Sequence, residues 1–304
     1  MKLFDLHCDT LNRLYETGKD LKNHKGSVSL TGMKNYNKCV RCFAIWTDDN
    51  ISELDANKQF YEMYDIFKEQ LSLFKDDVTQ ITDKNSLENS KIGMMLTVEN
   101  CSALNNDIDN IKKFIDLGVK VFSLTWNGEN SLGYGQLENR GLKPFGRECV
   151  KAFEQTPAIL DVSHLSEKGF YDICELSEKA FVATHSNAKS IAPHNRNLSD
   201  GQIREIINRK GLIGLNLYSV FLNENPEKAN KYDILRHAEH ILSLGGENVL
   251  SIGTDFDGAA VIKELKNDKK LTGLEKLFLE NGFPRDITDK MLYKNAENFF
   301  IENL

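Results

Sequence analysis

The sequence has no apolar run approaching the length of a membrane-spanning helix, which needs about 20 consecutive apolar residues. Its start also lacks the apolar segment and cleavage site of a secretory signal peptide, because charged Asp5 already lies within the first apolar stretch. The net charge of -7 offers no excess of positive charge for a nucleic-acid backbone or an anionic membrane. We therefore expect a cytoplasmic protein that binds neither nucleic acid nor membrane. Whether the protein forms a homodimer is left open.

Cysteine is scarce and scattered, with six residues in the chain. Only Cys39 and Cys42 form a C-x-x-C pair, and no second pair completes the spacing of a zinc ribbon. A structural zinc or a redox pair stays open as an alternative, but reduced, buried thiols are the default in the cytoplasm. Repeats, low-complexity tracts and linkers are also absent, so the sequence predicts a single domain over residues 1–304.

Segments rich in β-branched and apolar residues recur along the chain, and most are followed by an amphipathic helical stretch. The predicted strands cover residues 2–6, 40–46, 92–98, 119–124, 158–162, 181–183, 212–217 and 249–253. This alternation is typical of an α/β protein with parallel strands and right-handed crossovers. Eight such units at this length predict a (β/α)8 TIM-type barrel, with an open doubly wound sheet as the alternative.

Polar and aromatic side chains stand at the ends of the predicted strands. In chain order they are His7 and Asp9, Glu99, Trp126, His164, His185 and Asp255. All strands of a barrel end on one face, where barrel enzymes carry their active sites, so these residues would converge. The alternative for His7 and Asp9 is a surface histidine and an N-capping aspartate before a helix that starts near Thr10.

Burying several carboxylates and imidazoles without partners would be costly, and a divalent metal would satisfy both kinds of group. Three neutral histidines and two carboxylates can share two zinc ions if one carboxylate bridges them. Glu99 suits the bridge because its longer side chain reaches inward, and Asp255 is then left free as an acid or base. His237 and His240 lie three apart on a predicted helix, and we expect them at the surface.

An ordered set of motifs gives the chain a family resemblance. The motifs are Asp5-Leu-His-Cys-Asp9, Thr97-Val-Glu99, Leu124-Thr-Trp-Asn127, Gly141-Leu-Lys-Pro-Phe-Gly146, Asp161-Val-Ser-His164, Thr184-His-Ser-Asn187, Asn195-Arg-Asn197 and Gly253-Thr-Asp-Phe-Asp-Gly258. Together they resemble the membrane (renal-type) dipeptidase family, peptidase family M19, among the amidohydrolase-like metal-dependent hydrolases. The resemblance runs through most of the chain.

The resemblance implies a binuclear zinc site in an amidohydrolase-like barrel. His7, Asp9 and Glu99 would hold one Zn²⁺, and Glu99, His164 and His185 would hold the other. Arg196 matches the family's substrate-contacting arginine, and Asp255 matches its acidic residue near the attacking water. The remaining residues expected to bind substrate are Trp126, Asn127 and Tyr218.

Two positions depart from the family pattern. Trp126 stands where animal members have a substrate-binding histidine, and its indole cannot ionise and offers only one N–H. The usual Glu-Gly-Gly is replaced by Glu99-Asn100-Cys101, which would narrow the pocket beside the metals. The first change bears on how the developing oxyanion is stabilised.

The function implied is that of a zinc-dependent dipeptidase, in which a metal-bridging hydroxide attacks the amide bond of a dipeptide. Asp255 would take the proton of the attacking water and pass it to the leaving amine. The resemblance also implies tolerance of a D-residue at the C-terminal side. The alternatives are another amidohydrolase-like activity, on a lactone, phosphoester, cyclic amide or β-lactam, and a non-catalytic metal- or ligand-binding barrel.

Overall fold

All eight predicted strands form, and they pair in parallel in chain order. In the computed structural model, which describes residues 1–304, they are β1 (Lys2–Cys8), β2 (Lys38–Trp46), β4 (Ile92–Glu99), β5 (Val119–Ser123), β6 (Ile159–Asp161), β7 (Val182–Ala183), β8 (Leu212–Leu215) and β9 (Leu250–Ile252). β1 pairs with β9 and β2 pairs with β4, so the sheet closes into a barrel. The prediction of a TIM-type barrel is therefore confirmed over the open sheet.

One short strand was not predicted. β3 (Thr79–Gln80) pairs with β4 at Gly93 and Met94, and β5 pairs with the second half of β4, from Leu96 onward. β3 therefore extends the sheet to nine strands without entering the closed ring.

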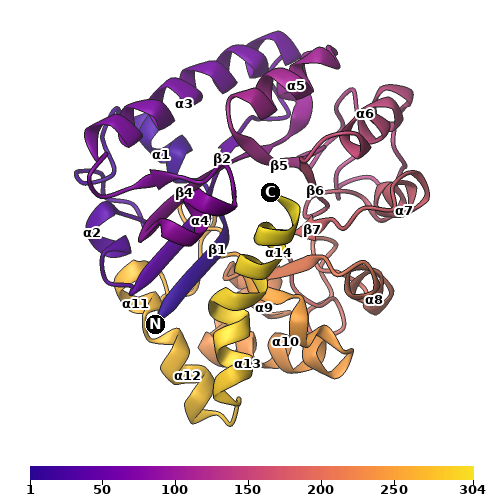
Figure 1. The fold of residues 1–304 in the computed structure, drawn as a ribbon. Helices are drawn as coiled ribbons and strands as arrows, with labels where there is room; N and C mark the ends of the chain where they lie inside the picture. Colours follow the sequence, from indigo (N-terminus) through magenta and orange to yellow (C-terminus); the bar gives the residue numbers. More distant parts are fainter.

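The helices surround the barrel (Figure 1). They are α1 (Thr10–Thr17), α2 (Leu30–Met33), α3 (Glu53–Leu73), α4 (Lys84–Asn89), α5 (Asp109–Asp116), α6 (Pro144–Glu154), α7 (Glu167–Leu176), α8 (Asp200–Asn208), α9 (Ser219–Leu222), α10 (Lys231–Ser243), α11 (Asp268–Leu271), α12 (Leu274–Glu280), α13 (Arg285–Asp289) and α14 (Asn295–Asn303). Serine side chains at positions 52, 166 and 199 accept backbone N–H bonds at the starts of α3, α7 and α8. None of the helices combines the length and the apolar character needed to span a bilayer.

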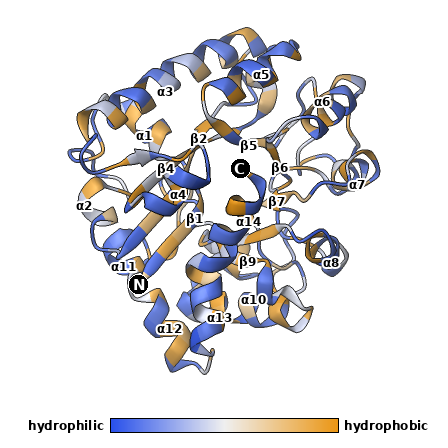
Figure 2. Ribbon diagram, viewed as in Figure 1, coloured by the Kyte–Doolittle hydropathy of each residue, from blue (hydrophilic) through white to orange (hydrophobic).

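Two apolar clusters hold the barrel together. The larger lies between the strands and the surrounding helices, whose inner sides are apolar in Figure 2. The smaller fills the amino-terminal half of the barrel, where Phe4, Val40 and Val182 meet Phe300 of α14. The Phe4 and Phe300 rings stack with their centroids 5.2 Å apart. In Figure 1 α14 lies across this end, so the barrel opens at the carboxyl ends of its strands.

The C-x-x-C pair is not a metal site. Cys39 packs in the outer apolar cluster, whereas Cys42 packs in the cluster inside the barrel, because residues three apart on a strand point to opposite faces. The Cys42 sulfur lies 3.8 Å from the sulfur of Met95. All six cysteines are free thiols, and no disulfide joins Cys39 to Cys42.

The expected surface position of His237 is wrong. Its side chain is fully buried, and its two ring nitrogens lie 3.1 Å from the Ala188 backbone nitrogen and 3.0 Å from the Leu222 carbonyl oxygen. His237 therefore fastens α10 to the chain that follows β7. Burial lowers its pKa to about 4, so the ring stays neutral at neutral pH. His240 is partly exposed and lies 2.8 Å from Asp200.

Candidate metal centre

A β-bulge at the end of β1 directs His7 into the barrel. Between Asp5 and Cys8 the pairing of β1 with β2 shifts by one residue. Such a bulge re-aims the side chain that it carries. The His7 ring lies with its centroid 3.9 Å from that of His185, which follows β7 across the barrel. The two imidazoles are thus brought together although they lie far apart in the sequence.

Asp9 occupies the N-cap position of α1, yet its side chain makes no capping hydrogen bond. Its Oδ2 lies 3.2 Å from Nε2 of His7 instead. Both side chains are almost fully buried. The structure therefore disfavours the reading of this pair as a surface histidine and a helix cap.

Glu99, the last residue of β4, lies between imidazoles on both sides. Its Oε2 is 3.3 Å from Nε2 of His7, and its Oε1 is 2.7 Å from Nε2 of His164. The Nε2 atoms of His164 and His185 are 2.9 Å apart. Each Glu99 oxygen therefore faces a different imidazole group, which is the arrangement that a carboxylate shared by two metal ions requires.

Two of the imidazoles are oriented by hydrogen bonds at their far nitrogens. Nδ1 of His164 lies 3.1 Å from Oδ1 of Asn127, and Nδ1 of His185 lies 2.8 Å from Oγ1 of Thr184. The Thr184 hydroxyl in turn donates to Asp161 at 2.7 Å. Partners of this kind fix the tautomer of a metal-binding histidine and leave Nε2 free for the metal.

Charge in the centre is unevenly divided between the histidines. Burial opposes a charge on His7, but the carboxylates of Asp9 and Glu99 outweigh it and raise the pKa of His7 well above its usual value. Burial, aided by the positive charges of Arg196 and His7, lowers the pKa of His164 well below its usual value, and the pKa of His185 falls for the same reasons. Neutral imidazoles are the form that binds a metal.

Burial outweighs the nearby positive charges at two carboxylates of the centre. Burial raises the pKa of Glu99 to about 8, and it also raises the pKa of Asp255. In each of two sets of three residues, the potential ligand atoms lie within 4.8 Å of one another. One set is His7, Glu99 and His185, and the other is His7, Asp9 and Asp255. Nitrogen and carboxylate donors at this spacing fit Zn²⁺, which would also neutralise the buried acids. The residues present therefore fit divalent metal ions.

Asp255 and Asp257 follow β9 and have different surroundings. Asp255 has a left-handed backbone with φ of 60°, and its Oδ2 accepts a hydrogen bond of 2.9 Å from Asn216. Asp257 accepts a 2.7 Å bond from the Thr10 hydroxyl and a 2.6 Å bond from the Ser27 backbone N–H. These contacts agree with a loop-capping role for Asp257 and leave one Asp255 oxygen unoccupied by protein donors.

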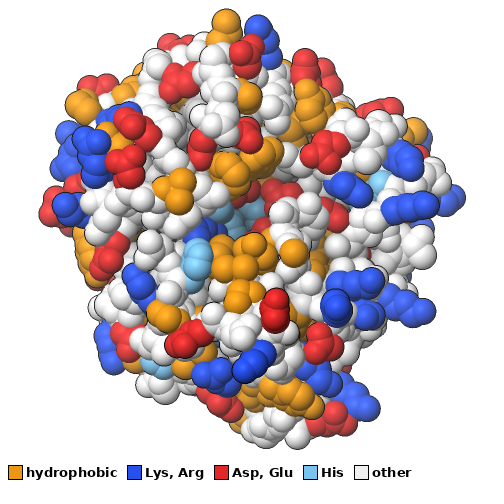
Figure 3. All heavy atoms as spheres, turned by 180° about the vertical axis from the view of Figure 1, so that it is seen from behind, with side chains coloured by type: hydrophobic (Ala, Val, Ile, Leu, Met, Phe, Trp, Pro, Cys, Tyr) orange, Lys and Arg blue, Asp and Glu red, His pale blue; other side chains and the backbone are white.

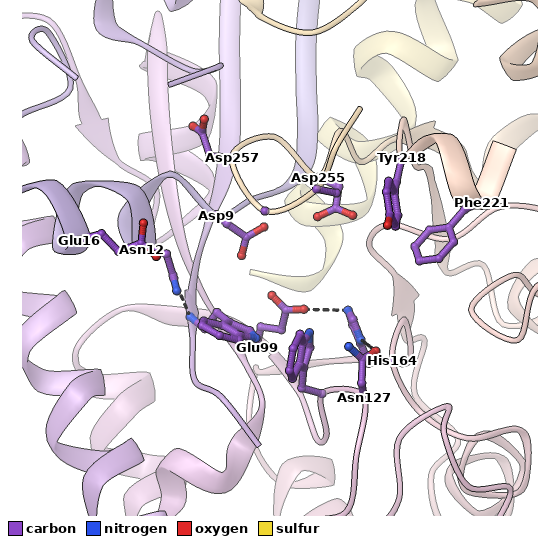
Figure 4. Close-up of a pocket in the computed structure, with 14 residues that line it drawn as sticks. Asp9, Asn12, Glu16, Glu99, Asn127, His164, Tyr218, Phe221, Asp255 and Asp257 are labelled. Carbon is purple, nitrogen blue, oxygen red and sulfur yellow. Dashed lines mark hydrogen bonds and ion pairs between the residues drawn. The ribbon is translucent and has the colours of Figure 1, made fainter. Parts of the chain in front are cut away.

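A cavity of about 350 Å³ opens over the centre. Figure 3 shows it as a hollow with acidic and histidine side chains at its floor and apolar side chains at its rim. Its lining residues, several of which are labelled in Figure 4, are Asp9, Asn12, Glu16, Trp46, Glu99, Trp126, Asn127, His164, Tyr218, Phe221, Asp255, Asp257, Gly258 and Ala259. The cavity thus brings most of the sequence-predicted site residues together.

Aromatic pairs form two parts of the cavity wall. The Trp46 and Trp126 rings meet edge to face with centroids 4.9 Å apart. Tyr218 and Phe221 form a second edge-to-face pair, also at 4.9 Å. Trp126 and Tyr218 therefore occupy places from which they can touch a ligand.

Arg196 lies behind the cavity wall. Its side chain is buried, and its guanidinium donates to the backbone carbonyl of Ser163. The guanidinium carbon lies 5.2 Å from the centroid of the Phe221 ring. Its Nε has no hydrogen-bond partner. Burial lowers its pKa to about 10, which still leaves the guanidinium charged at neutral pH.

Several residues of the site were missed from the sequence. Trp46 ends β2 and could have been found by the strand-end rule. Asn12 and Glu16 follow Asp9 at positions that share one face of a helix. Asn216, which contacts Asp255, carried no signal of its own.

A family model described as membrane dipeptidase, peptidase family M19, matches residues 1–299. Among curated relatives, the dipeptidase tcpJ of Claviceps purpurea is 25% identical over 254 residues. The match covers 82% of this chain and 58% of tcpJ, so the chain spans little more than half of that relative's length.

Solved structures resemble the whole chain. A metallopeptidase from Rhodobacter sphaeroides, liganded with a phosphinate mimic of the dipeptide L-Ala-D-Ala, has a TM-score of 0.93 at 24% identity, with 100% of this chain and 99% of the other covered. The dipeptidase AC, a metallopeptidase of family M19, has a TM-score of 0.93 at 25% identity, with 100% and 98% covered.

Proposed function

Because the chain belongs to peptidase family M19, the membrane dipeptidases, we propose that it is a zinc-dependent dipeptidase built as a single barrel domain. The observation that carries the proposal is the position of Glu99, whose two oxygens face His7 on one side and His164 on the other. We propose that Glu99 bridges two Zn²⁺ ions, with His7 and Asp9 completing one site and His164 and His185 the other. When bound, the ions would polarise the scissile carbonyl and lower the pKa of the attacking water.

Asp255 is the residue proposed to move protons. Its carboxylate lines the cavity and lies close to Asp9 and His7, while Asn216 holds one of its oxygens. The other oxygen can accept the proton of the attacking water and pass it to the leaving amine. A hydrogen bond from Asn216 fixes the orientation of the carboxylate during both transfers.

The substrate would lie between the two aromatic pairs of the cavity. Trp126, Asn127 and Tyr218 are proposed to contact it directly, since all three line the cavity. Arg196 is proposed to bind its terminal carboxylate, because the guanidinium is charged and keeps one unpartnered N–H. Phe221 covers Arg196 on the cavity side, so this contact needs the Phe221 ring to shift.

The dipeptide class is supported by the size of the cavity and by the relatives. A cavity of about 350 Å³ suits a dipeptide better than a long peptide. The Rhodobacter sphaeroides metallopeptidase was solved with a mimic of L-Ala-D-Ala. We propose that this chain likewise accepts a D-residue at the C-terminal side.

The test is a screen of L,L- and L,D-dipeptides on zinc-loaded protein, with metal content measured in the same samples. We expect turnover of dipeptides and two zinc ions per chain. Turnover of lactones, phosphoesters or cyclic amides without dipeptide hydrolysis would assign another amidohydrolase-like activity. Bound metal without any turnover would indicate a non-catalytic barrel.

A further inference from the structure

One carboxylate on the cavity wall has no part in the proposed reaction. Of the five acids that line the cavity, Asp9, Glu99, Asp255 and Asp257 already have contacts that explain them, which leaves Glu16. The nearest cation to Glu16 is Nη1 of Arg13 at 3.9 Å, and both side chains are largely exposed. Such a pair contributes little. Glu16 is therefore free to pair with a ligand.

α1 leads from the metal centre to the rim of the cavity. Asp9, Asn12 and Glu16 share one face of this helix, since they lie three and four residues apart. Asp9 is buried, Asn12 is half-buried and Glu16 is exposed. Figure 4 shows Asn12 and Glu16 projecting from the same helix. Oδ1 of Asn12 accepts the backbone N–H of Trp46 at 3.3 Å, which fastens α1 to the end of β2.

The wall beside α1 is aromatic and carries no basic residue. Trp46 and Trp126 both line the cavity, and indole faces attract cations. No lysine or arginine is among the fourteen lining residues. An anionic side chain would therefore find no partner here, whereas a cation would find an indole wall and the Glu16 carboxylate.

We propose that the preferred substrate carries a cationic side chain, lysine or arginine, whose alkyl stem lies along Trp46 and Trp126 and whose charged head pairs with Glu16. This inference rests on the proposed dipeptidase function and names the substrate class of that site. The α-ammonium group of any dipeptide has the same chemistry, so the experiment must separate the two sources of charge.

The experiment compares kcat/KM for dipeptides that differ only in charge, with lysine against norleucine and arginine against citrulline, at each position beside alanine. We expect the cationic member to be favoured by about threefold to tenfold at one position. Glu16→Gln should bring that ratio close to one. Glu62→Gln is the matched control, because Glu62 is an exposed carboxylate on α3 that contacts Tyr15 outside the cavity.

Two outcomes would overturn the proposal. If the unmodified protein has equal kcat/KM for the charged and the neutral dipeptide of each pair, it has no preference for a cationic side chain. If Glu16→Gln lowers kcat/KM equally for the charged and the neutral dipeptide, Glu16 would be assigned to the α-ammonium group instead. Calorimetry measures the Kd of the same charged and neutral dipeptides. A lack of turnover would count against the proposed function, but the ratio of the two Kd values would still test the preference for a cationic side chain.

Discussion

Glu99 is the residue on which the proposed metal pair depends most, because each of its oxygens faces a different imidazole group. Glu99→Gln replaces one of these oxygens by an amide nitrogen that cannot bind a metal. We expect the variant to hold at most one zinc ion and to lose at least about 100-fold in kcat. Metal analysis and kinetics on the same preparation measure both effects.

The matched control for Glu99 is the double variant Cys39→Ser with Cys42→Ser. These two thiols lie on opposite faces of β2, and neither belongs to the metal centre. Metal content should stay at the unmodified level. Loss of zinc from the cysteine variant would mean that the C-x-x-C pair binds metal after all.

Asp255 and Asp257 make a second comparison at this scale. Asp255→Asn is nearly isosteric and should keep both metals, but kcat should fall by roughly 10²–10⁴-fold, the usual contribution of a positioned general base. KM should change far less. Asp257→Asn should mainly loosen the loop that Asp257 holds through Ser27. A large fall in kcat for Asp257→Asn alone would move proton transfer to that residue.

The candidate ligands could be predicted from the sequence because each follows a recognisable strand. Other parts of the site could not be predicted, since they depend on loop conformation. Asn216 donates to Asp255, whose backbone is left-handed, and nothing in the spacing of the two residues indicates this contact. The burial of Arg196 behind Phe221 likewise depends on how the chain after β7 folds.

At the scale of elements, strand positions were predicted closely and short helices were not. Apolar, β-branched segments bounded by turns mark the strands, but a helix of four residues has too little periodicity to detect. α11 illustrates this: it has only four residues in a charged segment, yet its Asp268 is almost fully buried. Its partner, Arg41 on β2, is fully buried as well.

Arg41 links α11 to the strand that carries His7. Its guanidinium pairs with Asp268 on one side and with Asp5 on the other. Asp5 also accepts the backbone N–H of Thr254 at 2.8 Å, next to Asp255. One buried cation therefore joins β1, β2, α11 and the chain after β9 behind the metal centre.

Arg41→Met should destabilise the fold, because it leaves the Asp5 and Asp268 carboxylates buried without a counter-charge. We expect a loss of about 3–5 kcal/mol in the free energy of unfolding, measured by urea titration. Lys58→Met removes an exposed pair with Asp55 and should cost less than about 1 kcal/mol. Adding Asp268→Asn to Arg41→Met should recover part of the loss. If it recovers nothing, lost packing rather than charge explains the effect.

At the scale of the whole molecule, the barrel was predictable because alternation of strands and helices limits the topology to few choices. The family was indicated by the resemblance of an ordered set of motifs, from Asp5–Asp9 to Gly253–Gly258. The sequence did not indicate that α14 closes the amino-terminal end, since its role depends on the tertiary contact between Phe300 and Phe4. The cytoplasmic location stays a prediction, and whether the chain forms a homodimer stays open.

The metal centre should also stabilise the whole barrel. The proposed ligands stand at the ends of β1, β4, β6 and β7, so they come together only in the folded chain. A ligand that binds only the folded state at about 100 times its Kd adds roughly 2.7 kcal/mol. We therefore expect removal of metal by a chelator to lower Tm by on the order of 5 °C, and added zinc to restore it. Glu99→Gln should respond less to zinc than the unmodified chain. An unchanged Tm after verified removal of all metal would mean that the site contributes nothing to holding the strand ends together.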